Sequence, residues 1–170
     1  DGKRHQVAVA TARAGNVIGG GDWAQDRLLP DFFRSVLAGN TIKIRNPQSI
    51  RPWQHVLEPL SGYLVLAERL YEQGAEVGES WNFGPAESGA QSVASVAECL
   101  CTRWGQGSRY ELDRSDQPPE AGFLRLDSSK ARSRLGWQPR WNLEKAIDAT
   151  VDWVLQWQAG ADPYLLTQSQ

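Results

Sequence analysis

Arg51 and Asn16 are the side chains of this sequence best suited to hold a phosphate group. Arg51 opens the segment RPWQHV, and its planar guanidinium offers a fork of donors that matches phosphate oxygens. Asn16 follows a segment with the pattern of a buried strand, and α/β proteins bind ligands at the carboxyl ends of such strands. The alternative is an Arg51 that stacks on Trp53, with His55 as an ordinary helix cap. The residues by themselves leave both arrangements open.

A glycine-rich stretch, 15–22, begins the loose dinucleotide-binding pattern Gly19-x-Gly21-x-x-Ala24. Its chemistry does not fit that function. Asp22 would place a negative charge among the amide donors meant for a pyrophosphate, and no acidic residue follows about 20 positions later to hold a ribose. A flexible connection between strand and helix is the favoured interpretation, with Trp23 beside it as a candidate ligand contact.

No other catalytic or metal site can be assembled from the sequence. The histidines lie fifty residues apart, and Cys99 and Cys101 belong to a helical pattern, so no metal ligand set is expected. There is no G-x-S-x-G nucleophile motif and no Tyr-x-x-x-Lys pair. Trp104, Trp153 and Trp157 lie on helical faces, which favours a place in the core. The residues of this chain therefore predict binding rather than catalysis.

The composition narrows the function further. Among 170 residues, 18 Lys and Arg face 20 Asp and Glu, and no basic run appears, which argues against nucleic acid as the main partner. No apolar run approaches the ~20 residues that span a bilayer. Two close, unpaired cysteines fit a reduced, cytoplasmic compartment. Because the chain contains no Met and begins DGKRH, we expect a piece of a longer protein or a processed product.

Strand and helix patterns alternate along the chain, which indicates the α/β class. Strands are predicted at 6–12, 42–45, 80–84, 110–112 and 124–126. Helices are predicted from about 27 to 39, from 57 to 74, after Ser92, after Asp127 and after Asn142. The helix that begins at 57 is marked by Leu57, Leu60, Leu64, Ala67 and Tyr71.

Four long segments, in unbroken order, carry a resemblance to a known family. They are TARAGNVIGGGDWAQDRLLPD (11–31), IRNPQSIRPWQHVLEPLSGYL (44–64), WNFGP (81–85) and LDSSKARSRLGWQPRW (126–141). Together they resemble the nucleotide-sugar 4,6-dehydratases of the extended short-chain dehydrogenases/reductases, in the branch that acts on CDP-glucose. The resemblance implies late strands of a Rossmann-type sheet with a glycine-rich substrate loop at 1–26. It implies a smaller nucleotide-sugar-binding domain at 27–170, some of whose segments return to the Rossmann half.

The resemblance also implies an activity for the whole enzyme. In that family, hydride passes from sugar C4 to NAD, water is eliminated across C5 and C6, and the hydride returns to C6, so CDP-glucose becomes CDP-4-keto-6-deoxyglucose. The NAD loop and the Tyr-x-x-x-Lys helix precede the part of the family that this chain resembles, so the chain alone is expected to be inactive. The alternatives are a related NAD-dependent epimerase or dehydratase and a non-catalytic carbohydrate-binding module.

Site residues follow from the resemblance position by position. Asn16 and Arg51 are expected to hold the nucleotide diphosphate. Arg13 lies near the expected nicotinamide side and is the candidate cofactor contact. The other expected substrate contacts are Asp22, Trp23, Arg27, Leu28, Asn82 and Glu120. The family usually has Pro-His-Glu-Ala-His around Glu120, whereas this chain has Pro119 and Gly122 in place of the histidines, a departure that bears on substrate identity and affinity.

The resemblance bears on association as well. Strands upstream of the predicted strand 6–12 normally cover its edge, and an open edge invites pairing with another chain. The resemblance implies a homodimer for the whole enzyme, and for this chain we expect self-association through the open edge or poor solubility.

Overall fold

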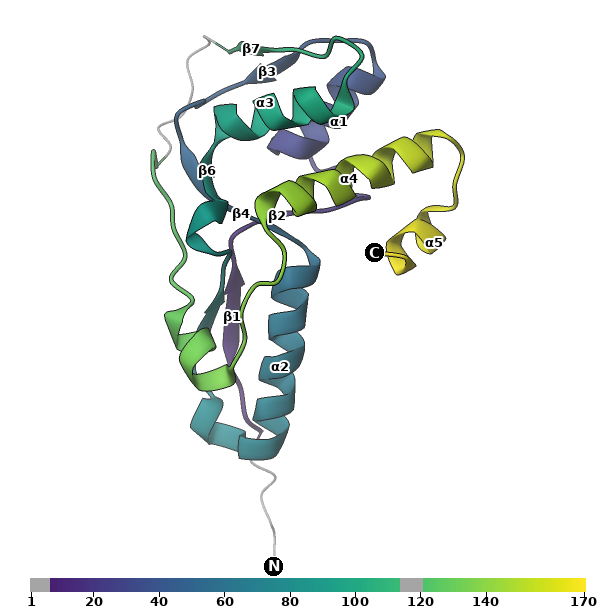
Figure 1. Cartoon of the computed structure of the whole chain (residues 1–170). Helices are drawn as coiled ribbons and strands as arrows, with labels where there is room; N and C mark the ends of the chain where they lie inside the picture. Colours follow the sequence, from purple (N-terminus) through teal and green to yellow (C-terminus); the bar gives the residue numbers. More distant parts are fainter. Residues whose placement is uncertain (1–6, 114–120) are drawn as a thin grey trace, which may run out of the picture.

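A computed structural model describes residues 7–113 and 121–170 and shows the α/β class (Figure 1). The strands are β1 (Thr11–Ala14), β2 (Asn16–Ile18), β3 (Ile42–Ile44), β4 (Ile50–His55), β5 (Ser80–Phe83), β6 (Ala90–Ser92) and β7 (Tyr110–Leu112). The helices are α1 (Leu28–Leu37), α2 (Leu57–Gln73), α3 (Val93–Trp104), α4 (Leu143–Gln158) and α5 (Pro163–Gln168). None of the helices in these ranges has the length and apolar character that a membrane crossing requires.

The described strands form three small sheets. β1 and β5 pair in parallel, β3 and β7 pair in parallel, and β4 lies between a parallel β2 and an antiparallel β6. Figure 1 shows α1, α3, β3 and β7 gathered at one end of the molecule, β1 and α2 at the other, and α4 beside β2 and β4 between them. β2 and β4 thus connect the two groups of elements.

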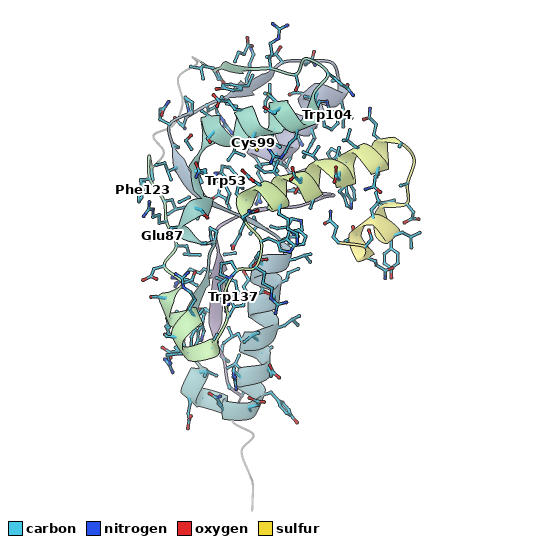
Figure 2. All side chains as sticks on the ribbon, viewed as in Figure 1. Trp53, Glu87, Cys99, Trp104, Phe123 and Trp137 are labelled. Atoms are coloured by element: carbon cyan, nitrogen blue, oxygen red, sulfur yellow. The ribbon has the colours of Figure 1, made fainter. Side chains whose placement is uncertain are left out.

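The larger hydrophobic core lies between α1, α3 and α4. Phe32 and Phe33 of α1 present their rings to Trp104 at the end of α3, with centroid distances of 6.3 and 5.9 Å. Trp53 of β4 belongs to the same core and lies near its centre in Figure 2. Aromatic packing of this kind fixes α1 and α3 relative to the central sheet.

A smaller core fills the other end. Trp81 and Phe83 of β5 are fully buried between α2 and a π-helical turn, Ala131–Leu135. Trp137 meets Phe83 edge to face at 5.1 Å and is labelled in Figure 2. The backbone of α2 approaches the same ring at Gly62, where a Cβ would lie 2.2 Å from Phe83 Cδ1. Glycine therefore allows α2 to pack directly on β5.

Most predicted helices and their caps are confirmed. α1 and α2 begin and end within two residues of the predicted positions, and α3 and α4 begin directly after their predicted caps. Ser92 Oγ accepts from Ser95 N at 3.1 Å, and Asn142 Oδ1 accepts from Lys145 N at 2.9 Å, as helix N-caps do. Asp127 Oδ1 accepts from Ser129 N at 2.8 Å, at the start of the short helical segment that ends with the π-helical turn.

Three strand predictions are corrected. The predicted strand 6–12 is displaced, because β1 begins only at Thr11, and Val7 and Val9 are 83% and 69% exposed rather than buried. The predicted strand 124–126 is wrong, since pairing there is limited to one bridge between Phe123 and Ile50. The glycine-rich stretch predicted as a flexible loop contains β2, which pairs with β4. β4, β6 and α5 had no prediction.

The apolar residues that marked α2 in the sequence face solvent. Leu64 is 73% exposed and Tyr71 is 93% exposed, whereas Gly62 and Leu66, on another face of the helix, are buried against β5 and its surroundings. The periodicity identified the helix correctly, but it did not identify the face that packs. Small residues that permit close approach decide that face.

Gly62→Ala is expected to destabilise the protein although alanine favours helix. Helix propensity alone would stabilise by about 1 kcal/mol. Overpacking against Phe83 is expected to outweigh it and lower the free energy of unfolding by about 1–3 kcal/mol. Urea unfolding followed by circular dichroism measures whether the free energy of unfolding falls or rises. The double variant with Phe83→Leu should recover part of the loss, and a stabilised single variant would contradict the packing.

Self-association through β1 remains a prediction that the fold makes testable. In the described part of the chain β1 pairs with β5 alone, and Thr11 N donates to Glu79 O. Because alternate residues of a strand face opposite edges, the Ala12 peptide groups face the open edge. Ala12→Pro is expected to abolish a concentration-dependent rise in sedimentation coefficient, and Ala12→Thr to retain it. A wild-type chain that stays monomeric at high concentration would contradict the expectation.

Candidate functional site

A cavity of about 410 Å³ opens between β2, β4, β3 and the start of α1. This volume falls in the range of small-molecule sites. Asn16 and Arg51 both line it, as do three more of the residues expected to contact substrate: Asp22, Arg27 and Leu28. The structure therefore brings together five side chains that the sequence spreads over 36 positions.

The register of β2 on β4 explains how Asn16 meets Arg51. Asn16 lies opposite Trp53 in the parallel pair, and Arg51 precedes Trp53 by two residues. Side chains two apart on a strand point to the same face, and so do those of paired residues. Arg51 is only 7% exposed, and its Nη1 donates to Ile50 O at 3.0 Å. A guanidinium held in this way has a defined direction at the cavity wall.

The N-terminal end of α1 forms another part of the wall. Arg27 is its N-cap, and the cap makes no side-chain hydrogen bond to the first turn. Leu28, Leu29 and Pro30 of that turn all line the cavity. The N–H groups of Leu28 and Leu29 can donate to an anion there, whereas Pro30 has no N–H and Asp31 of the same turn adds a carboxylate to the cavity wall. The helix start therefore adds two backbone donors to the guanidinium of Arg51, while Asp31 offsets part of the positive charge of the helix end.

The wall also carries charged residues that sequence reasoning missed. Lys43 and Arg45 lie on and just after β3, and Asp26 lies in the turn before α1. Arg45 Nη2 and Asp26 Oδ1 form an ion pair of 3.2 Å, and Lys43 Nζ lies 3.8 Å from Glu111 Oε1. Two cations on a short alternating strand next to a turn were the available signal. Only the packing of β3 against α1 brings them to the cavity.

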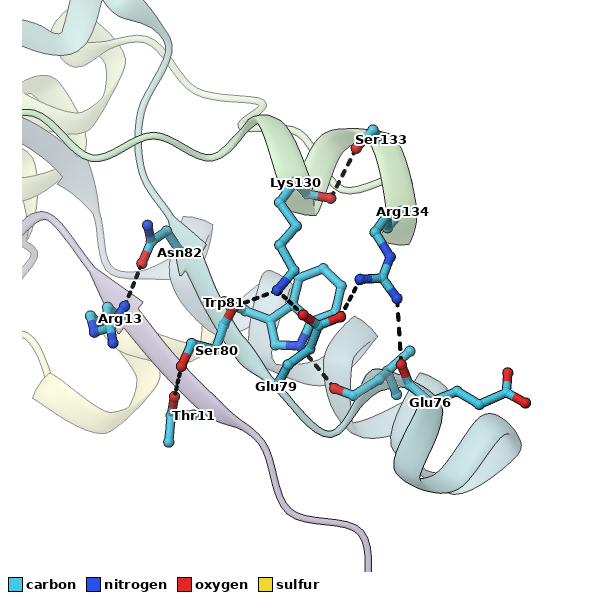
Figure 3. Close-up of polar contacts among 11 residues, drawn as sticks. Thr11, Arg13, Glu76, Glu79, Ser80, Trp81, Asn82, Lys130, Ser133 and Arg134 are labelled. Carbon is cyan, nitrogen blue, oxygen red and sulfur yellow. Dashed lines mark hydrogen bonds and ion pairs between the residues drawn. The ribbon is translucent and has the colours of Figure 1, made fainter.

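Three expected site residues lie elsewhere among the described residues. Trp23 does not line the cavity, because its ring packs on Trp157 at 5.0 Å. Arg13 Nη1 donates to Asn82 Oδ1 at 3.2 Å across β1 and β5, as Figure 3 shows, and neither residue lines the cavity. Glu120 lies outside the described residues.

The glycine-rich stretch does not form a dinucleotide cradle. A Cβ at Gly20 would lie 2.1 Å from Trp153 Cγ, so this glycine allows the backbone to pack on α4. β2 interrupts the stretch, and α1 begins only at Leu28, so the strand–turn–helix geometry of a pyrophosphate loop is not formed. Asp22 Oδ1 accepts from Ala24 N at 3.0 Å. These residues do not fit NAD, and the described ranges hold no group of three or more metal-ligating side chains.

His55, at the end of β4, is fully buried beside the site. Its ring packs on Trp141 at 4.6 Å, and Lys145 Nζ lies 4.1 Å from the same indole. Nδ1 accepts from Leu57 N at 3.4 Å, and Nε2 has no hydrogen-bond partner among the residues that the structure describes. Burial first, and then the charge of Lys145, lower the pKa of His55 from 6.5 to about 4. The folded protein therefore holds this imidazole neutral.

A buried carboxylate fixes Trp141 against His55. Glu58, in the first turn of α2, accepts from Arg140 N at 2.7 Å and from Trp141 N at 3.0 Å. Ser61 Oγ accepts from Trp137 Nε1 at 2.9 Å in the next turn. These bonds hold the segment that leads into α4, and they satisfy a carboxylate that would be costly to bury alone.

A charged cluster far from the cavity holds the π-helical turn on β5 (Figure 3). Lys130 and Arg134 both form ion pairs with Glu79, and Lys130 Nζ lies 4.4 Å from the centre of the Trp81 indole. The hydrogen bond from Lys130, together with one from Arg134, lowers the pKa of the Glu79 carboxyl. The cluster lies on the other core and contributes nothing to the cavity.

The sequence is similar to nucleotide-sugar dehydratases. No family model matches it. It is 49% identical to CDP-glucose 4,6-dehydratase of Salmonella typhimurium over 168 residues, which are 99% of this chain and 47% of that protein. It is 25% identical to dTDP-glucose 4,6-dehydratase of Xanthomonas campestris over 140 residues, 76% of this chain and 38% of that one. The chain thus spans less than half the length of these curated relatives.

Solved structures share the fold. UDP-glucuronic acid 4-epimerase from Bacillus cereus, in complex with UDP-glucuronic acid and NAD, aligns with a TM-score of 0.76 at 20% identity, over 91% of this chain and 48% of that one. dTDP-glucose 4,6-dehydratase from Bacillus anthracis, in complex with NAD, aligns with a TM-score of 0.66 at 21% identity, over 91% and 47%. The α/β chain therefore has the fold of about half of an extended epimerase or dehydratase.

The buried His55 is expected to make stability depend on pH. In the unfolded chain His55 binds a proton below about pH 6.5, whereas in the folded chain it does so only below about pH 4. The free energy of unfolding should therefore fall, by about 3 kcal/mol, as the pH drops through this window. His55→Phe, which keeps a ring against Trp141, should remove that part of the slope.

Urea unfolding of both proteins from pH 7 to pH 4 measures the difference between their curves, which cancels the titration of the carboxylates. His5→Gln changes the other histidine of the sequence and serves as the control, which should keep the wild-type slope. Parallel curves for wild type and His55→Phe would contradict a neutral buried imidazole.

Proposed function

Because the chain is a homologue of CDP-glucose 4,6-dehydratase, we propose that it is the substrate-binding part of an enzyme that converts CDP-glucose to CDP-4-keto-6-deoxyglucose. The observation that carries this proposal is that Asn16 and Arg51, far apart in sequence, line one cavity at the start of α1. That set of groups is suited to the diphosphate of a nucleotide sugar. Solved proteins of this fold are described in complex with UDP-glucuronic acid or UDP-glucose, which supports the same class of ligand.

Each group has a separate task in the proposed complex. Arg51 donates from its fork to the phosphate oxygens, and its burial keeps the fork in place before the ligand arrives. Asn16 donates an amide hydrogen to the same diphosphate from the neighbouring strand. Arg27 adds a positive charge, the N–H groups of Leu28 and Leu29 add donors, and the Leu28 side chain covers the nucleotide. Burial of a diphosphate among these donors replaces the water that the anion loses.

The redox chemistry belongs to groups that these residues do not supply. When bound, NAD accepts and returns the sugar hydride in the relatives' reaction, but the glycine-rich stretch of this chain packs on α4 and does not fit a dinucleotide. The sequence also has no Tyr-x-x-x-Lys pair. The proposal for these 170 residues is therefore binding without turnover, with Arg13 and Asn82 on the β1–β5 sheet as contacts toward the cofactor side and the sugar.

The domain division remains part of the proposal. Residues 1–26 would supply the last part of a Rossmann-type sheet and the substrate loop, and 27–170 the nucleotide-sugar domain. β5, from the second segment, pairs with β1, from the first, which agrees with segments that return to the Rossmann half. The whole enzyme is proposed to be a homodimer. Glu120, with Pro119 and Gly122 beside it, keeps its proposed role toward the nucleotide.

Calorimetric titration of the 170-residue chain with CDP is expected to show binding, and Arg51→Lys to weaken it by about 10-fold, because lysine keeps the charge but loses the fork. Asn16→Ala should weaken it less. Arg69→Lys, on α2 outside the cavity, is the matched control and should leave the affinity unchanged. Melting temperatures verify that each variant is folded.

Free glucose provides the opposing arm of the same experiment. A carbohydrate-binding module would bind glucose and ignore CDP, whereas a nucleotide-sugar site depends on the diphosphate for most of its affinity. Heat from glucose without heat from CDP, or equal CDP affinity for wild type and Arg51→Lys, would overturn the proposed function.

A further inference from the structure

We propose that the ion pair between Asp26 and Arg45 recognises the cytosine base, so that the site prefers a cytidine diphosphate to a uridine or thymidine diphosphate. This inference rests on the proposed function, since it places a nucleotide in the cavity. It goes beyond that function because it assigns the selectivity for the base to two residues with no earlier role.

The Asp26–Arg45 pair is distinguished by its place. Within residues 7–113 and 121–170, other ion pairs near the cavity have only one partner on its wall: Asp31 pairs with Arg34, and Lys43 with Glu111. Asp26 and Arg45 both line it. A ligand in the cavity would therefore meet a carboxylate and a guanidinium side by side.

The pair also lies on other elements than Asn16 and Arg51, the two side chains proposed to hold the diphosphate. Arg45 directly follows β3, and Asp26 lies in the turn before α1, whereas Asn16 and Arg51 belong to β2 and β4. Figure 1 shows β3 and α1 together on one side of β2 and β4. A nucleotide whose diphosphate lies at Arg51 can therefore extend its base toward β3.

The turn holds the carboxylate in position. Asp26 has a φ of 60°, in the left-handed region that few residues other than glycine adopt and that Asp tolerates better than most. Its Oδ1 lies 3.2 Å from Arg45 Nη2, and the side chains are 79% and 42% exposed. The turn and the ion pair together orient a carboxylate that a ligand can still reach.

The pattern of donors and acceptors in this pair complements cytosine. Cytosine presents an N4 amino donor beside the N3 and O2 acceptors. Asp26 can therefore accept from N4 while Arg45 donates to N3 or O2. Uracil and thymine present the O4 carbonyl oxygen at the same corner and an N3–H donor next to it. A carboxylate opposite O4 repels it, and a guanidinium opposite N3–H has no acceptor. The same pair therefore favours the binding of cytosine and disfavours that of uracil and thymine.

The names of the relatives indicate which nucleotides to compare. The relative that is 49% identical is named for CDP-glucose, whereas relatives named for UDP-glucose and dTDP-glucose are 24% and 25% identical. An exposed ion pair adds little to folding stability. Removal of the carboxylate should therefore leave the melting temperature nearly unchanged, which makes the effect on binding a clean measurement.

Calorimetric titrations with CDP and with UDP test the inference on the 170-residue chain. Wild type is expected to bind CDP about 10-fold more tightly than UDP, as one good base contact provides. Asp26→Asn should weaken CDP binding by about 10-fold and leave UDP binding unchanged or tighter, because an amide can donate to O4. The CDP preference should then disappear.

Asp148→Asn is the matched control. Asp148 is an exposed carboxylate on α4 that pairs with Arg103 away from the cavity, and its loss should change neither affinity. Equal binding of CDP and UDP by wild type would overturn the inference and leave the proposed function standing. An Asp26→Asn variant with the wild-type preference, or with equal losses for both nucleotides, would do the same. A wild-type chain that binds neither nucleotide would overturn both.

Discussion

The parallel pairing of β2 with β4 is the constraint on which the candidate site depends. It places Asn16 opposite Trp53, and Arg51 lies two residues before Trp53 on the same face. The backbone approach is close, since a Cβ at Gly15 would lie 2.3 Å from Pro52 O. A shift of one residue in this register would send Asn16 to the opposite face and separate it from Arg51.

The two cores of the molecule are connected by buried polar groups rather than by one continuous sheet. Gln54 of β4 donates from Nε2 to Phe83 O at 2.8 Å, and the Glu58 carboxylate holds the backbone that leads from the π-helical turn into α4. Such bonds are specific in direction, because a buried group without its partner costs free energy. The position of α4 beside β2 and β4 therefore depends on contacts made at the other end.

The cavity combines features that the sequence could suggest with others that it could not. Arg51 stood out by its residue type and its place before Pro52, and Asn16 by its place after a strand. Asp26 lies in an irregular turn and gave no such signal, and Arg45, directly after the three-residue β3, gave only the weak signal of a cation on a short alternating segment. Trp23 had a plausible position beside the glycines, yet Trp157 takes up its ring. The tertiary fold, and not the neighbouring residues in the sequence, determines which aromatic rings pack on each other.

The sequence by itself determined the features that depend on neighbouring residues. The four longer helices, their caps at Ser92 and Asn142, and the α/β class follow from local periodicity and capping chemistry. The tertiary structure alone decided that the glycine-rich stretch contains β2, that the apolar stripe of α2 faces solvent, and that Arg13 and Asn82 lie apart from the cavity. These outcomes depend on contacts between residues tens of positions apart. Local sequence patterns do not predict the free energy of such contacts.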